Sequence, residues 1–146
     1  MKQPQYSLEN KNGCREVGYK MIVDDCPFCD IDPNRIEDEN DLCVAIRDQY
    51  PVTELHTLII PKRHVSSFFD LEDHERDAIF ALLQAQKRAL EGLDSSISGF
   101  NIGVNIGEDG GQTIFHCHVH LIPRRKGDVP EPRGGVRGVI PSKQTY

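Results

Sequence analysis

The sequence lacks a long apolar run, since none approaches the roughly 18–20 residues that cross a membrane. Residues 1–5 also lack the apolar stretch of a secretory signal, so we expect a cytoplasmic protein with no membrane partner. Positive charge is scarce, because 17 Lys and Arg stand against 23 Asp and Glu, for a net charge of −6. Such an acidic balance argues against a protein that coats nucleic acid or an anionic membrane.

Cysteine occurs five times, an odd number that argues against a disulfide framework in a reducing compartment. Cys26 and Cys29 form a tight pair with two residues between them, which suggests a metal site or a redox site. We expect Cys14, Cys43 and Cys117 to be plain thiols in small apolar roles.

The chain length of 146 residues suits a single domain with its own core. Residues 1–22 are polar and carry few apolar side chains, so we expect an N-terminal extension followed by one domain over 23–146. The domain ends in an irregular basic tail rich in Gly and Pro. From Asp24 to Asp41 carboxylates outnumber the single Arg35, which indicates a solvated face.

Hydrophobic periodicity predicts a mixture of strands and one helix. Short β-prone or alternating runs predict strands at residues 42–46, 56–60, 100–106 and 113–122. Apolar residues at helical spacing behind an N-cap at Asp70 predict a helix over about 71–91.

Three histidines, His116, His118 and His120, alternate with apolar residues. In a strand they would share one face, while the residues between them would enter the core. At about 3.3 Å per residue the outer two lie about 13 Å apart, so the three cannot bind one ion and must have different roles.

A glycine-rich turn, residues 107–111, stands shortly before these histidines. Such a turn can bring backbone N–H groups close to an anion, and Gln112 and Thr113 add side-chain donors. Beside three histidines this favours a phosphate site. Taken alone, the turn would favour an ordinary hairpin.

The run His-Cys-His-Val-His-Leu-Ile at 116–122 matches the His-φ-His-φ-His-φ-φ signature of the histidine-triad (HIT) superfamily of nucleotide hydrolases and transferases, where φ is apolar. Residues 110–113, 58–64 and 26–29 also resemble bacterial members, so the resemblance covers about 26–126. It implies an α+β HIT-like fold, with an antiparallel sheet of about five strands, one long helix and usually a homodimer.

The resemblance also implies catalytic roles. His118 would be the nucleophile that attacks the α-phosphorus and forms a nucleotidyl-histidine, which water or another acceptor resolves. The second ring nitrogen of His118 needs an acceptor, often a backbone carbonyl, to fix its tautomer. His120 would contact the phosphate, and His56 would orient the phosphate or the leaving group.

Further positions resemble the nucleotide-binding residues of the family. Asp48 would accept hydrogen bonds from the ribose hydroxyls. The phosphate or leaving group would be contacted by Asn105, Gly111, Gln112 and Thr113. Ile46, Phe28 and Ile31 would form an apolar slot for the purine, although a plain core role explains these three equally well.

In bacterial relatives His64 and His116 complete a ligand set with the cysteine pair. The resemblance therefore implies a zinc ion held by Cys26, Cys29, His64 and His116. The ion would be structural, since the protein fills all four positions. Redox-active or vestigial cysteines are the alternative.

The function implied is cleavage at the α-phosphate of a purine nucleotide conjugate, either a dinucleoside polyphosphate or a nucleoside phosphoramidate, with release of AMP or GMP. The alternative is a zinc-stabilised nucleotide-binding or interaction module with little turnover. A nucleic-acid end-processing enzyme is disfavoured by the acidic charge. Neither the leaving group nor the base preference can be read from these motifs.

Overall fold

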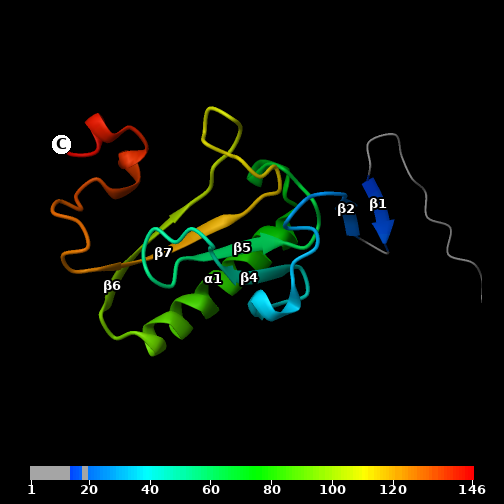
Figure 1. The fold of residues 1–146 in the computed structure, drawn as a ribbon, viewed down its shortest axis with the longest axis horizontal. Coiled ribbons are helices and arrows are strands. Elements are labelled where there is room, and N and C mark those ends of the chain that lie inside the picture. The colour runs from blue at the N-terminus through cyan, green and yellow to red at the C-terminus, as the bar shows by residue number, and fades with distance from the viewer. Residues whose placement is uncertain (1–13, 18–19) are drawn as a thin grey trace, which may run out of the picture.

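The protein folds into an α+β domain in which one long helix covers a five-stranded antiparallel sheet (Figure 1). The computed structural model describes residues 14–17 and 20–146. In chain order these elements are β3 (Ile36–Glu39), β4 (Cys43–Arg47), β5 (Thr57–Pro61), α1 (Asp73–Leu93), β6 (Ile97–Gly103) and β7 (Val119–Arg125). The strand order β3-β4-β5-β7-β6, antiparallel throughout, confirms the predicted fold class.

A two-stranded antiparallel sheet, β1 (Cys14–Val17) and β2 (Lys20–Val23), precedes the domain. It lies at the opposite end of the molecule from the C-terminal segment (Figure 1). Both strands fall almost wholly within the predicted extension, residues 1–22. The structure describes no other residues of this extension. The Cys14 side chain, predicted to be a plain thiol, also lies outside the described side chains.

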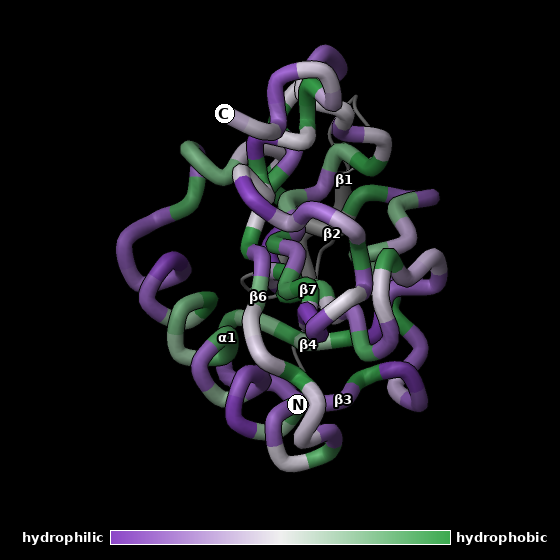
Figure 2. Tube along the Cα trace, turned by 90° about the vertical axis from the view of Figure 1, so that its left-hand side faces the viewer, coloured by the Kyte–Doolittle hydropathy of each residue, from purple (hydrophilic) through white to green (hydrophobic). Residues whose placement is uncertain are grey.

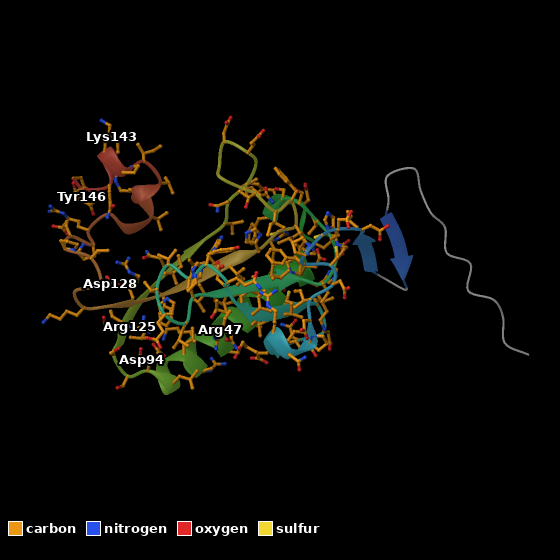
Figure 3. The ribbon with its side chains drawn as sticks, in the orientation of Figure 1. Arg47, Asp94, Arg125, Asp128, Lys143 and Tyr146 are labelled. Carbon is orange, nitrogen blue, oxygen red and sulfur yellow. The ribbon has the colours of Figure 1, made fainter. Side chains whose placement is uncertain are left out.

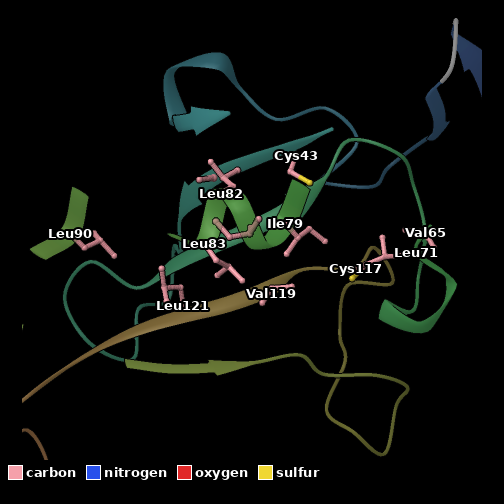
Figure 4. Packing of buried hydrophobic residues seen from close by; sticks show 12 residues of the cluster. Cys43, Val65, Leu71, Ile79, Leu82, Leu83, Leu90, Cys117, Val119 and Leu121 are labelled. Carbon is pink, nitrogen blue, oxygen red and sulfur yellow. The ribbon is translucent and has the colours of Figure 1, made fainter. Parts of the chain in front are cut away.

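The main core lies between α1 and the sheet (Figure 4). Its members include Ile79, Leu82, Leu83 and Leu90 of α1, Cys43, Ala45 and Ile59 of β4 and β5, and Cys117, Val119 and Leu121 around the start of β7. Polar and apolar residues alternate along α1 (Figure 2), so one face of the helix packs on the sheet. As predicted, the Cys43 and Cys117 thiols are buried, and burial raises the pKa of each to about 12.

The opposite face of the sheet carries a second apolar cluster. Its buried members are Phe28, Val44, Ile46, Leu58 and Ile60. β4 and β5 are therefore buried on both faces, which explains why each reads as a continuous apolar run. Both strands begin and end within one residue of the predicted positions.

The helix lies two residues further along the chain than predicted. Asp70 belongs to a preceding 3-10 turn, and Glu72 is the N-cap of α1 in a capping box with Glu75. The helix continues through Gly92 to Leu93. In the described part of the chain no helix combines the length and apolarity that a membrane span requires.

Both β6 and β7 are displaced from their predicted ranges. β7 begins at Val119 because the N–H of Cys117 donates to the Val65 carbonyl, outside the sheet. β7 continues through Pro123, because β5 begins at Thr57, opposite Leu121, and beyond this point β7 has a neighbour on the β6 side alone. β6 spans 97–103 instead of 100–106, so the glycine-rich segment joins β6 to an irregular run that contains His116 and His118.

β3 lies inside the acidic run that was predicted to be a solvated face. It is an edge strand that pairs with β4 alone. Two of its carboxylates have cationic partners, Glu37 with Arg47 at 3.4 Å and Glu39 with Lys62 at 2.7 Å. The Glu37 and Glu39 side chains are nevertheless 42 % and 55 % exposed, so the predicted solvated face is confirmed here, although the strand itself was not predicted.

The Arg63–Glu75 pair at the start of α1 gives a first prediction. The Glu75 carboxylate is 4 % exposed and accepts from Arg63 at 2.7 Å and 2.8 Å and from the backbone N–H of Glu72. Replacing it by Gln leaves Arg63 without its counter-charge, so Glu75→Gln should lower the unfolding free energy by about 2–4 kcal/mol in urea. The control Glu91→Gln, at an exposed pair with Lys87, should cost less than about 0.5 kcal/mol, and equal losses would contradict the assignment.

Candidate functional site

The three histidines occupy different environments along residues 116–120. His116 and His118 are 0 % and 8 % exposed and lie before β7, whereas His120 is half-buried within the strand. The expectation that all three lie in one strand is therefore wrong, because the strand begins only at Val119. Their shared side is confirmed, since Phe28 packs on His116 and His118 and the rings of His118 and His120 are 5.1 Å apart, whereas Cys117, Val119 and Leu121 enter the main core. His120 pairs with Leu58 and faces away from α1, while Val119 on the other side enters the main core as predicted.

His116 belongs to a cluster with Cys26, Cys29 and His64, whose ligand atoms all lie within 4.8 Å of one another. The His116 Nδ1 atom is 3.5 Å and 3.6 Å from the sulfurs of Cys26 and Cys29, and His64 Nδ1 is 3.2 Å from the Cys29 sulfur. The four predicted metal ligands therefore come together from three separate segments of the chain.

These distances suit a tetrahedral metal ion. Zinc bound at about 2.3 Å to sulfur and 2.0–2.1 Å to nitrogen would separate the two ligand atoms by about 3.6 Å. His116 Nε2 lies 2.7 Å from the Pro61 carbonyl oxygen, so this nitrogen carries the proton and Nδ1 keeps its lone pair toward the cluster. Burial lowers the pKa of His116 to about 4 and also lowers that of His64, which favours the neutral ligand form. The cluster could thus hold a metal ion.

His118 is held through one ring nitrogen. Its Nδ1 lies 2.8 Å from the His116 carbonyl oxygen, an acceptor only, so Nδ1 carries the proton and donates. The lone pair therefore lies on Nε2. The ring packs edge-on against Phe28, with 5.1 Å between centroids. The resemblance implied a backbone carbonyl as the acceptor for one ring nitrogen of His118, and the His116 carbonyl occupies that place.

His56 and His120 form a chain of hydrogen bonds with a defined direction. The N–H of Val52 donates to His56 Nδ1 at 3.1 Å, which places the His56 proton on Nε2. That proton points to His120 Nδ1 at 3.0 Å, so the His120 proton is on Nε2. Burial is the main cause that lowers the pKa of both rings, to about 4 for His120. Among the described residues His120 Nε2 is a buried donor without a partner.

Asp48, His56 and His120 have ligand atoms close enough to suggest a second metal site. The Asp48 Oδ2 atom is 3.6 Å from His56 Nε2. However, both nitrogens of neutral His56 are engaged, since Nδ1 accepts from Val52 and Nε2 carries the proton. His56 has no lone pair left for a metal, so His56 and His120 form a hydrogen-bonded pair with the Asp48 carboxylate beside it.

A cavity of about 430 Å³ opens beside His120. It brings together Asp48, His56, Asn105 and His120 from the predicted site. Sequence reasoning missed its apolar lining, which includes Tyr50, Val52, Ile102, Ile122, Val136 and Val139. The last two belong to the C-terminal tail, which was predicted to be irregular and basic and was not assigned to the site.

The C-terminal tail is tied to the domain at its base (Figure 3). Arg125 pairs with Asp94 at 2.7 Å, and Arg124 pairs with Asp128 at 2.7 Å. The Arg137 guanidinium donates to the Lys143 carbonyl at 3.0 Å. The Arg137 bond lies within the tail, whereas the Arg124 and Arg125 pairs fix the segment that leads into it.

The glycine-rich turn is closed on itself. The N–H groups of Gly110 and Gln112 donate to Gly107, and that of Gly111 donates to Glu108. The Gln112 amide donates to the carbonyls of Ser66 and Ile114 at 2.9 Å and 3.2 Å. This arrangement corrects the expectation that Gly111 and Gln112 donate to a phosphate, because their donors already have partners.

The predicted purine slot is largely a packed surface. Ile46 is fully buried and Phe28 nearly so, both within the second apolar cluster, while Ile31 lies at its edge. The core interpretation therefore accounts for Ile46. Thr113 is exposed and Asn105 is half-buried, which leaves their side chains as the accessible donors near the turn.

Comparison with known proteins shows the family. The HIT-domain model matches residues 32–127. An uncharacterized HIT-like protein of Borreliella burgdorferi is 38% identical over 109 residues, which are 71% of this chain and 78% of that protein. Adenylylsulfatase HINT3 of Arabidopsis thaliana is 34% identical over 121 residues, which are 80% of this chain and 61% of that protein. A Zn-bound histidine triad family protein from Mycobacterium smegmatis superposes with a TM-score of 0.65 and 35% identity, covering 73% of this chain and 80% of that one.

The buried ring of His120 predicts a pH-dependent stability. Its pKa of about 4 lies below the ordinary value near 6.5, so the unfolded chain binds more protons between these pH values. The unfolding free energy should therefore fall as the pH drops from about 6.5 toward about 4. His120→Gln should reduce this fall in urea titrations at successive pH values, whereas exposed His74→Gln should leave it unchanged. The same pH dependence in wild type and His120→Gln would contradict the burial argument.

Proposed function

The chain belongs to the HIT family, and on that premise we propose that it cleaves purine nucleotide conjugates at the α-phosphate, with His118 as the nucleophile. The observation that carries this proposal is the hydrogen bond from His118 Nδ1 to the His116 carbonyl. That bond leaves the Nε2 lone pair for attack on phosphorus. The name of the adenylylsulfatase relative agrees with such chemistry at an adenylyl group.

The reaction proposed has two steps. His118 Nε2 forms a bond to the α-phosphorus as the bond from phosphorus to the leaving group breaks, which gives a nucleotidyl-histidine. Water then attacks the same phosphorus, the phosphorus–nitrogen bond breaks, and AMP or GMP leaves. Throughout, the proton stays on His118 Nδ1 and is donated to the His116 carbonyl oxygen, a hydrogen bond that stabilises the cationic ring of the intermediate.

His120 serves as an electrostatic stabiliser in this proposal. Its Nε2 proton is a buried donor without a protein partner, suited to a phosphate oxygen that gains charge. Giving that proton away would leave an imidazolate, because Nδ1 already accepts from His56. His120 therefore donates a hydrogen bond to the phosphate, and His56 fixes the ring in the orientation that does so.

The remaining site residues would hold the nucleotide. We assign the ribose hydroxyls to Asp48, and the phosphate or leaving group to Asn105 and Thr113. Gly111 and Gln112 would shape the turn that presents Thr113. Phe28 and Ile31 would flank the purine, and the cavity beside His120 offers room for the group attached to the far side of the phosphate.

We further propose that Cys26, Cys29, His64 and His116 hold a structural zinc ion. The ligand distances, the Pro61 contact of His116 and the Zn-bound family member support this. With four protein ligands no position is open to water, so the ion would supply rigidity and no chemistry.

A homodimer is the assembly we propose. Within the chain β6 is an edge strand that pairs with β7 alone. Apolar side chains are exposed on β6 and α1, at Ile102 and Phe80. A second copy would cover both. The cytoplasmic location, and the absence of nucleic-acid and membrane partners, stay predictions from composition.

The enzymatic proposal is tested by AMP release from adenosine phosphoramidate, diadenosine tri- and tetraphosphate, adenylyl sulfate and an AMP-lysine conjugate. Wild type should release AMP from at least one of them, and His118→Asn should be slower by about 1000-fold or more. His74→Asn, at an exposed histidine, is the matched control and should keep full activity. Tight AMP binding with no turnover of any conjugate would instead favour a nucleotide-binding module.

The zinc proposal is tested by metal content. Protein purified without chelators should contain about one zinc per chain, and Cys26→Ser/Cys29→Ser should contain less than about half. Cys43→Ala removes a buried thiol outside the cluster and should retain the zinc. A content unaffected by the double substitution would exclude the cluster as the site.

A further inference from the structure

We propose that His116 is a positioning residue that couples the metal cluster to the tautomer of His118; this inference rests on the proposed role of His118 as the nucleophile. A structural ion usually contributes only to folding. Here one residue supplies both a ring to the cluster and a carbonyl to the nucleophile.

The His116 ring is anchored at both nitrogens. Nε2 donates to the Pro61 carbonyl at 2.7 Å, and Nδ1 lies 3.5 Å and 3.6 Å from the sulfurs of Cys26 and Cys29. The ring is fully buried, with 0 % exposure. A bound metal would therefore fix the position of the His116 Cα atom as well as that of the ring.

The peptide unit that follows His116 is held at its opposite edge. The N–H of Cys117 donates to the Val65 carbonyl at 2.6 Å, and the His116 carbonyl accepts from His118 Nδ1 at 2.8 Å. This N–H and this carbonyl belong to one planar trans unit, so they point in opposite directions and rotate together. With the Cα atom held by the ring and the N–H held by Val65, the direction of the carbonyl is fixed.

The residues around this unit strengthen the coupling. Pro61 and Val65 lie in the same segment as His64, another member of the cluster. The bonds from the His116 ring to Pro61 and from the Cys117 N–H to Val65 do not require His64 as a ligand, so the ion can act on the peptide unit through the His116 ring alone. Without the ion, only sulfur–nitrogen contacts and the Pro61 bond hold the ring. The carbonyl can then turn, and His118 can adopt the tautomer in which Nε2 carries the proton and has no lone pair for phosphorus.

The test compares two zinc-loaded variants that each lose one histidine ligand, His64→Gln and His116→Gln. ¹⁵N NMR of the His118 ring reports which nitrogen carries the proton. His64→Gln should keep the wild-type pattern, with Nδ1 protonated and Nε2 bare. His116→Gln should show averaged signals from two tautomers, with kcat lower by at least about tenfold and KM changed by less than about threefold. Identical His118 patterns in the two variants would overturn the proposal.

Zinc removal from the wild type by a chelator is the second arm, with circular dichroism as the check on folding. The His118 signals should average in the zinc-free protein and return to the wild-type pattern when zinc is added back. Unchanged signals in a folded zinc-free chain would overturn the coupling. Unfolding of both the zinc-free chain and His116→Gln would also overturn it, because the ion would then act on the whole fold. The NMR result does not depend on turnover, so failure of the proposed activity is seen separately.

Discussion

The hydrogen bond from His118 Nδ1 to the His116 carbonyl fixes the tautomer of His118, on which the proposed chemistry depends. A neutral imidazole has one lone pair, and an acceptor at Nδ1 confines it to Nε2. The fold holds this one bond because the donor and the acceptor are only two residues apart, just before β7 begins.

Around this bond the three histidines have separate roles. His116 is turned into the Cys/His cluster, His118 presents its lone pair, and His120 presents a proton. The difference arises from the hydrogen-bond partner at one nitrogen of each ring. His116 and His118 each donate to a backbone carbonyl, whereas His120 accepts from His56. Burial keeps His116 and His120 neutral, so these donor and acceptor assignments persist at neutral pH.

Much of the fold could be predicted from the sequence because the segments with the clearest apolar patterns are those that form the buried core. β4, β5 and α1 carry continuous or periodic apolar runs and lie within two residues of their predicted positions. The start of β7 could not be predicted, since the alternation of residues 116–120 fits a strand although the Cys117 N–H bonds to Val65. β3 was missed because its acidic side chains find partners only in the folded chain.

At the candidate site, too, local sequence patterns could predict some of the residues but not the contacts between distant segments. The four members of the Cys/His cluster were named from motifs, and the structure brings them together. The closure of the glycine-rich turn by Gln112 depends on Ser66, a distant residue that no local pattern indicates. Val136 and Val139 line the cavity together with residues of β6 that lie far earlier in the chain, a proximity that no local pattern indicates.

The nucleotidyl-histidine itself is the most direct evidence to seek. Wild type mixed with a cleaved conjugate and quenched within the first turnover should yield a peptide over residues 116–122 that carries one adenylyl group on His118. Fragmentation mass spectrometry places the group on a single histidine. Adenylylated His118 is the predicted result; an adduct on His120, or turnover that proceeds without any adduct in the quenched enzyme, would contradict the account.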